Sequence, residues 1–248
     1  MENTIPKIIH YCWFGCKEKP KNVIKYINDW KIKLPDYEIV EWNESNFDVN
    51  CCKYSKEAYE ARKYAFVSDV ARLYALYNYG GIYLDTDVEV LKSFDDIVSD
   101  KKTVFGFEIG NRIATSFLAS MPHSEIIYEF LNSYQNMSFI LEDNTYNLTP
   151  NVEYLTNLLN KRGLQENGEF QSLENDIYVY PKEYFSPYDY INCIDESNSN
   201  TYCIHHYAVS WLNYGALIKR YLKMIYVKIF GKRNLILLRN MKNKLKGK

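Results

Sequence analysis

The stretch from residue 80 to residue 87 constrains the fold more than any other part of this sequence. A long amphipathic segment reaches two glycines, an apolar run follows over residues 82–84, and that run ends in two carboxylates, Asp85 and Asp87. Glycine commonly ends a helix, and a short apolar run is typical of a buried strand. In open α/β sheets, ligands bind beyond the carboxyl ends of the strands. The sequence therefore predicts a helix, a buried strand and a ligand site at the turn that carries the two aspartates.

The rest of the pattern predicts one α/β domain over residues 1–215. Strands are expected at residues 5–14, 37–42, 82–91, 104–108, 177–180 and 202–206, and helices at residues 21–33, 55–79, 124–134 and 151–164. The opening order of strand, helix and strand is typical of an α/β fold. We expect the helix over residues 55–79 to begin with the Ser55 hydroxyl as its cap.

Charge separates a second segment from this domain. All 31 acidic residues lie before residue 216, whereas residues 216–248 contain eleven Lys or Arg and no acid. Apolar side chains recur in this segment at helical spacing, which predicts a basic amphipathic helix: Leu217, Ile218, Tyr221, Leu222, Ile225, Tyr226, Ile229 and Phe230. We expect this tail to lie on an anionic membrane surface. The alternative is a helix that packs on the domain or pairs two chains.

The cysteines and the hydrophobicity profile indicate a cytoplasmic protein, peripheral on the inner face of the membrane if the tail binds there. The six cysteines form no Cys-x-x-Cys pair, so no zinc knuckle is expected and the thiols are expected to be reduced. Residues 1–7 do not resemble a secretion signal, and no apolar run approaches the ~20 residues that span a bilayer. The acidic domain contains no nucleic-acid recognition module, so nucleic acid is not an expected partner.

The two carboxylates at Asp85 and Asp87 indicate a divalent cation. Neighbouring carboxylates repel each other, and a cation relieves that repulsion. Oxygen ligands suit Mg²⁺ or Mn²⁺, and either ion can also bind phosphate oxygens. An acidic turn without a ligand is the alternative, because Asp-x-Asp alone is common.

Four separated motifs together resemble one family. They are IPKIIHYCWFG (residues 5–15), AFVSDVAR (65–72), GGIYLDTD (80–87) and HHYAVSW (205–211). In this order they resemble the DXD glycosyltransferases, and more narrowly the bacterial capsular-polysaccharide transferases related to the yeast mannosyltransferase that initiates outer chains. Clostridial glucosylating toxins share a related Ser-Asp-x-x-Arg and Asp-x-Asp arrangement.

The resemblance implies a GT-A fold, a Rossmann-like mixed sheet that holds a nucleotide sugar and a cation. It implies a metal-dependent hexosyltransferase that uses a UDP- or GDP-sugar and retains the anomeric configuration. The implied acceptor is a glycan or a polyprenyl-linked oligosaccharide, in the synthesis of a surface or capsular polysaccharide.

The resemblance also assigns roles around the donor. Trp13 would stack on the base, although a core tryptophan is an equal alternative. Asp69 would bind hydroxyls of the donor sugar, and Arg72 would lie near the sugar or the diphosphate; an intrahelical salt bridge between the two is the alternative. Tyr83 and Asp85 would contact the donor.

The remaining roles concern the cation and a lid. Asp87 is the expected direct metal ligand, with Asp85 binding the ion through water. His205 and His206 are adjacent on an expected strand, so at most one of them can reach the metal. Ser210 and Trp211 would close over the diphosphate.

Three other functions stay open at this point. Haloacid-dehalogenase phosphatases also carry Asp-x-Asp at a strand end, but they place a Thr or Val where this chain has Glu89. A relative that binds a nucleotide or glycan without turnover is the second. A toxin-like protein glycosyltransferase is the third.

Overall fold

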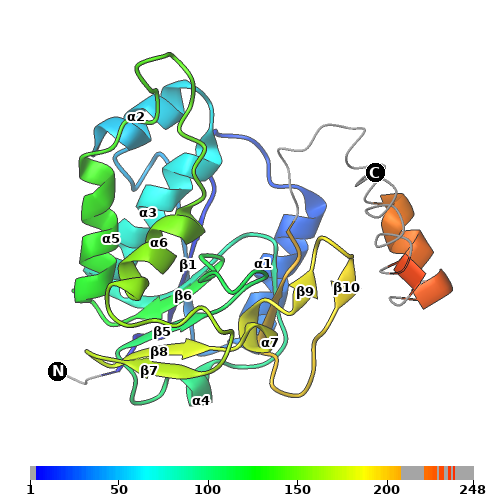
Figure 1. The fold of residues 1–248 in the computed structure, drawn as a ribbon. Coiled ribbons are helices and arrows are strands. Elements are labelled where there is room, and N and C mark those ends of the chain that lie inside the picture. Colours follow the sequence, from blue (N-terminus) through cyan, green and yellow to red (C-terminus); the bar gives the residue numbers. More distant parts are fainter. Residues whose placement is uncertain (1–3, 208–220, 228, 232–233, 236, 238–248) are drawn as a thin grey trace.

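A seven-stranded mixed sheet forms the centre of the molecule (Figure 1), in the computed structural model that describes residues 4–207, 221–227, 229–231, 234–235 and 237. The strand order is β2-β1-β3-β6-β5-β8-β7. The strands are β1 (Ile8–Cys12), β2 (Glu38–Trp42), β3 (Gly81–Leu84), β5 (Thr103–Gly106), β6 (Phe117–Ser120), β7 (Gln171–Leu173) and β8 (Ile177–Tyr180). Two smaller sheets pair β4 (Val88–Val90) with β11 (Cys203–His205), and β9 (Tyr188–Asp189) with β10 (Ile194–Asp195).

Helices cover both faces of the central sheet, as buried strands require. One apolar core lies between the sheet and the group formed by α2, α3, α5 and α6, and a second lies beneath α1 and β4 (Figure 1). The helices are α1 (Lys21–Lys33), α2 (Lys53–Glu60), α3 (Tyr64–Tyr79), α4 (Asp95–Val98), α5 (Glu125–Gln135), α6 (Asn151–Asn160) and α7 (Lys182–Phe185). The predicted α/β class is therefore confirmed for the described residues.

The register of the first three strands gathers two predicted site residues at one edge. β1 runs parallel to both neighbours, with Ile9 opposite Ile39 of β2 and Ile82 of β3. The carboxyl ends of the three strands therefore face the same way. Trp13 follows β1 and Asp85 follows β3, so both lie at this edge.

Two element predictions are wrong. The helix expected over residues 55–79 is divided into α2 and α3 by a turn in which Arg62 has a φ of 58°. The cap of α2 is Cys52, whose sulfur accepts the backbone N–H of Ser55 at 3.5 Å, so Ser55 lies inside the helix. The strand expected over residues 82–91 is likewise divided, because β3 belongs to the central sheet and β4 to a small one. The turn between them carries both aspartates.

The glycines before β3 allow the chain to pass directly from α3 into the sheet. Gly80 and Gly81 have φ values of 64° and 97°. Residues with a side chain rarely adopt such positive φ values. A Cβ on Gly81 would lie 2.6 Å from the carbonyl oxygen of Ile8 in β1. The close approach of β3 to β1 therefore depends on the absence of a side chain.

A buried histidine connects this turn to the sheet. His10 Nε2 lies 2.7 Å from the carbonyl oxygen of Gly80, and His10 Nδ1 accepts the indole N–H of Trp42 at 3.1 Å. One nitrogen must donate and the other must accept, so this arrangement requires the neutral ring. Burial lowers the pKa of His10 to about 4, against an upward contribution from the Gly80 carbonyl.

We expect this histidine to make stability depend on pH. Below pH 6.5 the unfolded chain binds a proton at His10 that the folded chain excludes. The contribution of neutral His10 to the free energy of unfolding is therefore complete only above pH 6.5. It is lost as the pH falls from 6.5 towards 4, by about 3 kcal/mol in total. Urea unfolding between pH 4.5 and 7.5 should show a shallower pH dependence for His10→Gln than for the wild type. The exposed His123→Gln variant is the control, and equal slopes for the wild type and His10→Gln would contradict the assignment.

Candidate functional site

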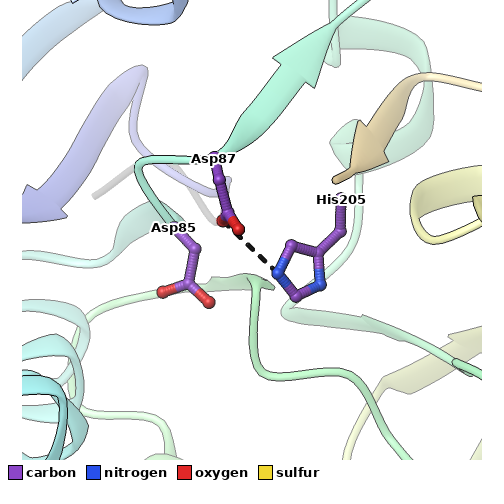
Figure 2. A group of neighbouring side chains, drawn as sticks. All are labelled: Asp85, Asp87 and His205. Atoms are coloured by element: carbon purple, nitrogen blue, oxygen red, sulfur yellow. Dashed lines mark ion pairs between the residues drawn. The ribbon is translucent and has the colours of Figure 1, made fainter. Parts of the chain in front are cut away.

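Three side chains that lie far apart in the sequence meet beyond the carboxyl end of β3. Asp85 follows β3, Asp87 precedes β4, and His205 ends β11, which pairs antiparallel with β4. One ligand atom from each lies within 4.8 Å of the other two, and His205 Nε2 is 3.3 Å from Asp87 Oδ1 (Figure 2). Two carboxylates and an imidazole at this separation form a candidate divalent-cation site.

Two buried side chains hold the carboxylate of Asp85 in place. The Tyr83 hydroxyl donates to Asp85 Oδ1 at 2.9 Å, and Arg72 Nη2 lies 3.5 Å from the same oxygen. The backbone N–H of Asp85 donates to the carbonyl of Ser116 at 3.0 Å. Tyr83 is only 2% exposed, so the structure places it as a support for Asp85.

Arg72 and Asp69 form a buried pair on one face of α3. Arg72 Nη2 lies 2.9 Å from Asp69 Oδ1, Arg72 Nη1 donates to the carbonyl of Thr115 at 2.8 Å, and the guanidinium lies 4.5 Å from the centre of the Tyr83 ring. Burial raises the pKa of Asp69 to about 7, although the charge of Arg72 opposes this. The salt bridge that was the alternative to donor binding is therefore present, and Arg72 also lies near Asp85.

Asn151 joins this network and was missed by the sequence analysis. Its amide N–H donates to Asp69 Oδ1 at 2.6 Å, and its amide oxygen accepts the hydroxyl of Thr115 at 2.7 Å. Asn151 is the first residue of α6, directly after Pro150. A polar side chain at the start of a helix is common, so the sequence contained no signal that marked this one as part of the site.

The two adjacent histidines separate as their strand predicts. His205 faces Asp87, whereas His206 Nε2 lies 2.8 Å from Glu89 Oε2 and the His206 ring stacks on Tyr26 at 5.5 Å. Among the described residues, His205 and not His206 joins the two aspartates. Burial lowers the pKa of His205, but the charge and hydrogen bond of Asp87 outweigh it and the net shift is upward.

Trp13 is half-buried and lines a cavity. The cavity has a volume of about 500 Å³ and is also lined by Lys17, Lys19, Glu41 and Asn43. The Trp13 indole N–H donates to the carbonyl of Lys17 at 2.6 Å. The ring is therefore held at the ends of β1 and β2 and is not enclosed in the core.

Two predicted site residues, Ser210 and Trp211, and most of the predicted tail lie outside the described residues. Among the described helices, none is long and apolar enough to cross a membrane.

Comparison with known proteins identifies the region around the site. Residues 20–104, which include the Asp85–Asp87 turn, match the family model for the glycosyltransferase sugar-binding region containing a DXD motif. Inositol phosphoceramide mannosyltransferase 3 of Schizosaccharomyces pombe is 29% identical over 146 residues, which cover 51% of this chain and 40% of the relative. Subversion of eukaryotic traffic protein A of Legionella pneumophila is 26% identical over 176 residues, which cover 57% of this chain and 27% of the relative. The chain thus spans less than half the length of these curated relatives.

A solved structure with a similar fold is the PaToxG glycosyltransferase. It superimposes with a TM-score of 0.51 and 22% identity, over 64% of this chain and 70% of that chain. The mixed sheet flanked by helices is therefore GT-A-like. Residues 20–104, which carry the Asp-x-Asp turn, are thus similar to the glycosyltransferase sugar-binding region containing a DXD motif.

Proposed function

We propose that this chain is a metal-dependent hexosyltransferase that moves a sugar from a nucleotide-sugar donor to a glycan or polyprenyl-linked acceptor. The observation that carries the proposal is the meeting of Asp85, Asp87 and His205 beyond β3, where both aspartates lie within the sequence region that matches the family model. The cation, Mn²⁺ or Mg²⁺, would supply positive charge where the departing nucleoside diphosphate gains negative charge.

The donor set fits such an ion. Carboxylate oxygens suit both Mn²⁺ and Mg²⁺, and an imidazole nitrogen is an accepted ligand of transition metals such as Mn²⁺. His205 Nδ1 is buried without a hydrogen-bond partner among the described residues, so Nε2 is the nitrogen that His205 offers towards Asp87. We assign Asp87 and His205 as direct ligands and Asp85 as a ligand through water.

Residues at this end of the sheet suit a nucleotide sugar. The Trp13 ring and its cavity provide a surface on which a UDP or GDP base can stack. Lys17 and Lys19 line the same cavity together with Glu41 and Glu44, and Lys19 forms an ion pair with Glu41 at 2.7 Å. Asp69 would bind donor-sugar hydroxyls, and Arg72 would orient the sugar or the diphosphate with a planar guanidinium that is already fixed by its core partners.

Retention of configuration follows from the family resemblance, and we assign no protein nucleophile. The donor phosphate would take the proton of the attacking hydroxyl on the same face of the sugar. Ser210 and Trp211 would exclude water from the donor when they close over it.

A screen of nucleotide sugars tests the proposal without knowledge of the acceptor. Slow hydrolysis of the donor is expected with one or a few UDP- or GDP-sugars, only when Mn²⁺ or Mg²⁺ is present, and it should stop with EDTA. Binding of a nucleotide sugar without turnover, across plausible acceptors, would favour a non-catalytic relative. Phosphate release from aryl phosphates, independent of nucleotide sugars, would favour a phosphatase instead.

We further propose that the basic tail brings the site to a membrane-linked acceptor. Residues 221–227 and 229–231 are helical and expose large apolar side chains, including Leu222, Ile229 and Phe230. Basic residues lie between them, and each contributes about 1 kcal/mol near an anionic surface. The Lys223 ammonium also donates to the carbonyl of Ile191 at 2.7 Å, so a packed tail is the competing arrangement.

Sedimentation with vesicles distinguishes these arrangements. The full chain is expected to co-sediment with anionic vesicles, more weakly as salt rises, and to stay in solution with neutral ones. A chain that ends at Gly215 should stay in solution with both. Equal binding of the two chains to anionic vesicles would exclude the tail as the membrane anchor.

A further inference from the structure

One nitrogen of the candidate cation site lacks a partner. His205 directs Nε2 towards Asp87 and leaves Nδ1 buried, without a hydrogen bond among the described residues. A buried polar atom without a partner destabilises a fold. In most metal sites, the second nitrogen of a histidine ligand donates to a carboxylate, a carbonyl or water, which fixes the ring and its tautomer.

Glu108 carries a carboxylate, which can accept a hydrogen bond from such a nitrogen when the nitrogen is protonated. It follows β5 at the start of a hairpin that the Phe107–Ile113 bridge closes, and its backbone N–H donates to the carbonyl of Arg112 at 2.7 Å. The hairpin therefore fixes its position. The Glu108 side chain is partly buried and interacts electrostatically with His205 and with Asp85. In the described part of the chain, no Lys or Arg forms an ion pair with it.

Tyr207 connects Glu108 to the histidine. The Tyr207 hydroxyl donates to Glu108 Oε2 at 3.2 Å, and the Tyr207 ring lies 3.8 Å from the His205 ring, centre to centre. Tyr207 has a φ of 47°, a backbone conformation that residues other than glycine rarely adopt. The Tyr190 ring lies 4.5 Å from the Tyr207 ring, centre to centre. The chain thus holds a strained tyrosine against the imidazole, with its hydroxyl on Glu108.

We propose that Glu108 is a positioning residue of the cation site, which accepts the Nδ1–H of His205, directly or through one water, and so presents Nε2 to the ion. Tyr207 orients the Glu108 carboxylate for this contact. Glu108 is not itself a ligand, because it lies outside the group of atoms formed by Asp85, Asp87 and His205. The inference rests on the proposed function, since it concerns the same cation.

Cation binding by the full chain tests the inference without any need for turnover. Mn²⁺ is titrated and the free ion is measured by electron paramagnetic resonance, with the metal alone and with UDP or GDP present. Glu108→Gln keeps the size of the side chain and removes its charge. We expect its Kd for Mn²⁺ to rise by about 10- to 100-fold. Tyr207→Phe should raise the Kd less, by a few-fold.

Two further variants separate positioning from a general effect of charge. Glu89→Gln removes a neighbouring carboxylate that pairs with His206 instead of His205, and it should change the Kd by less than about three-fold. If Glu108 acts through His205, then Glu108→Gln should have almost no further effect in a His205→Ala background. A wild-type Kd for Glu108→Gln would overturn the inference, and so would an equal loss in both backgrounds.

The result also distinguishes this inference from the proposed function. If the wild type binds no Mn²⁺ under any of these conditions, the cation itself is excluded. If the wild type binds Mn²⁺ and loses it in Asp87→Asn but not in Glu108→Gln, the cation site stands and only the positioning role fails. Thermal unfolding of each variant checks that a raised Kd does not come from an unfolded fraction.

Discussion

Asp87→Asn is expected to lower metal-dependent hydrolysis of the donor by at least about 10³-fold. The substitution keeps the shape of the side chain and removes the charge that, in the proposed site, would bind the cation. A neutral amide is a much weaker ligand, so the leaving diphosphate would lose most of the positive charge that stabilises it in the transition state. A loss of about 4 kcal/mol of that stabilisation corresponds to this factor.

The measurement is the initial rate of donor hydrolysis at saturating Mn²⁺, with whichever nucleotide sugar the screen identifies. The stability of the variant should be close to that of the wild type, because Asp87 lies at the partly exposed edge of the sheet. Asp176→Asn is a matched control, since Asp176 forms an exposed ion pair with Lys102. Full activity of Asp87→Asn would contradict the assignment of the cation site.

Arg72→Met is expected to reduce both stability and activity. Arg72 is 5% exposed, and its removal leaves the buried carboxylate of Asp69 without its cation. Breaking a buried ion pair from one side destabilises a protein by about 3–5 kcal/mol. Chemical unfolding should show a loss of this size. Arg112→Met, which breaks the more exposed pair with Glu166, should lose no more than about 1 kcal/mol.

A double variant separates the two roles of this pair. Asp69→Asn combined with Arg72→Met removes both charges, so it should recover part of the lost stability. It should not recover donor hydrolysis if Asp69 and Arg72 also bind the sugar and the diphosphate. A stable double variant with wild-type activity would show that the pair serves only the fold.

Local patterns in the sequence predicted the elements whose signals lie within a few residues. Three of the expected elements correspond to observed ones: the helix over 21–33, the strand before Asp85 and the late strand that carries His205. They could be predicted because apolar periodicity reports which side of a segment is buried. The break at residues 61–63 was not predicted, because apolar residues recur at helical spacing on both sides of it. The strand β6 was missed as well. It is a short segment that is fully buried between β3 and β5, and no periodicity distinguishes such a segment.

By itself, the sequence determined the chemistry of the two aspartates and their place after a buried strand. It also determined that at most one of two adjacent histidines could join them, because neighbouring side chains on a strand point to opposite faces. Only the tertiary structure decided that this histidine is His205, and that Asn151 and Glu108 lie beside the same site. The contact of His205 depends on the pairing of β11 with β4, and the contacts of Asn151 with Asp69 and of Tyr207 with Glu108 also join residues about a hundred positions apart. Long-range pairing of this kind arises from the packing of the whole chain, and no local pattern encodes it.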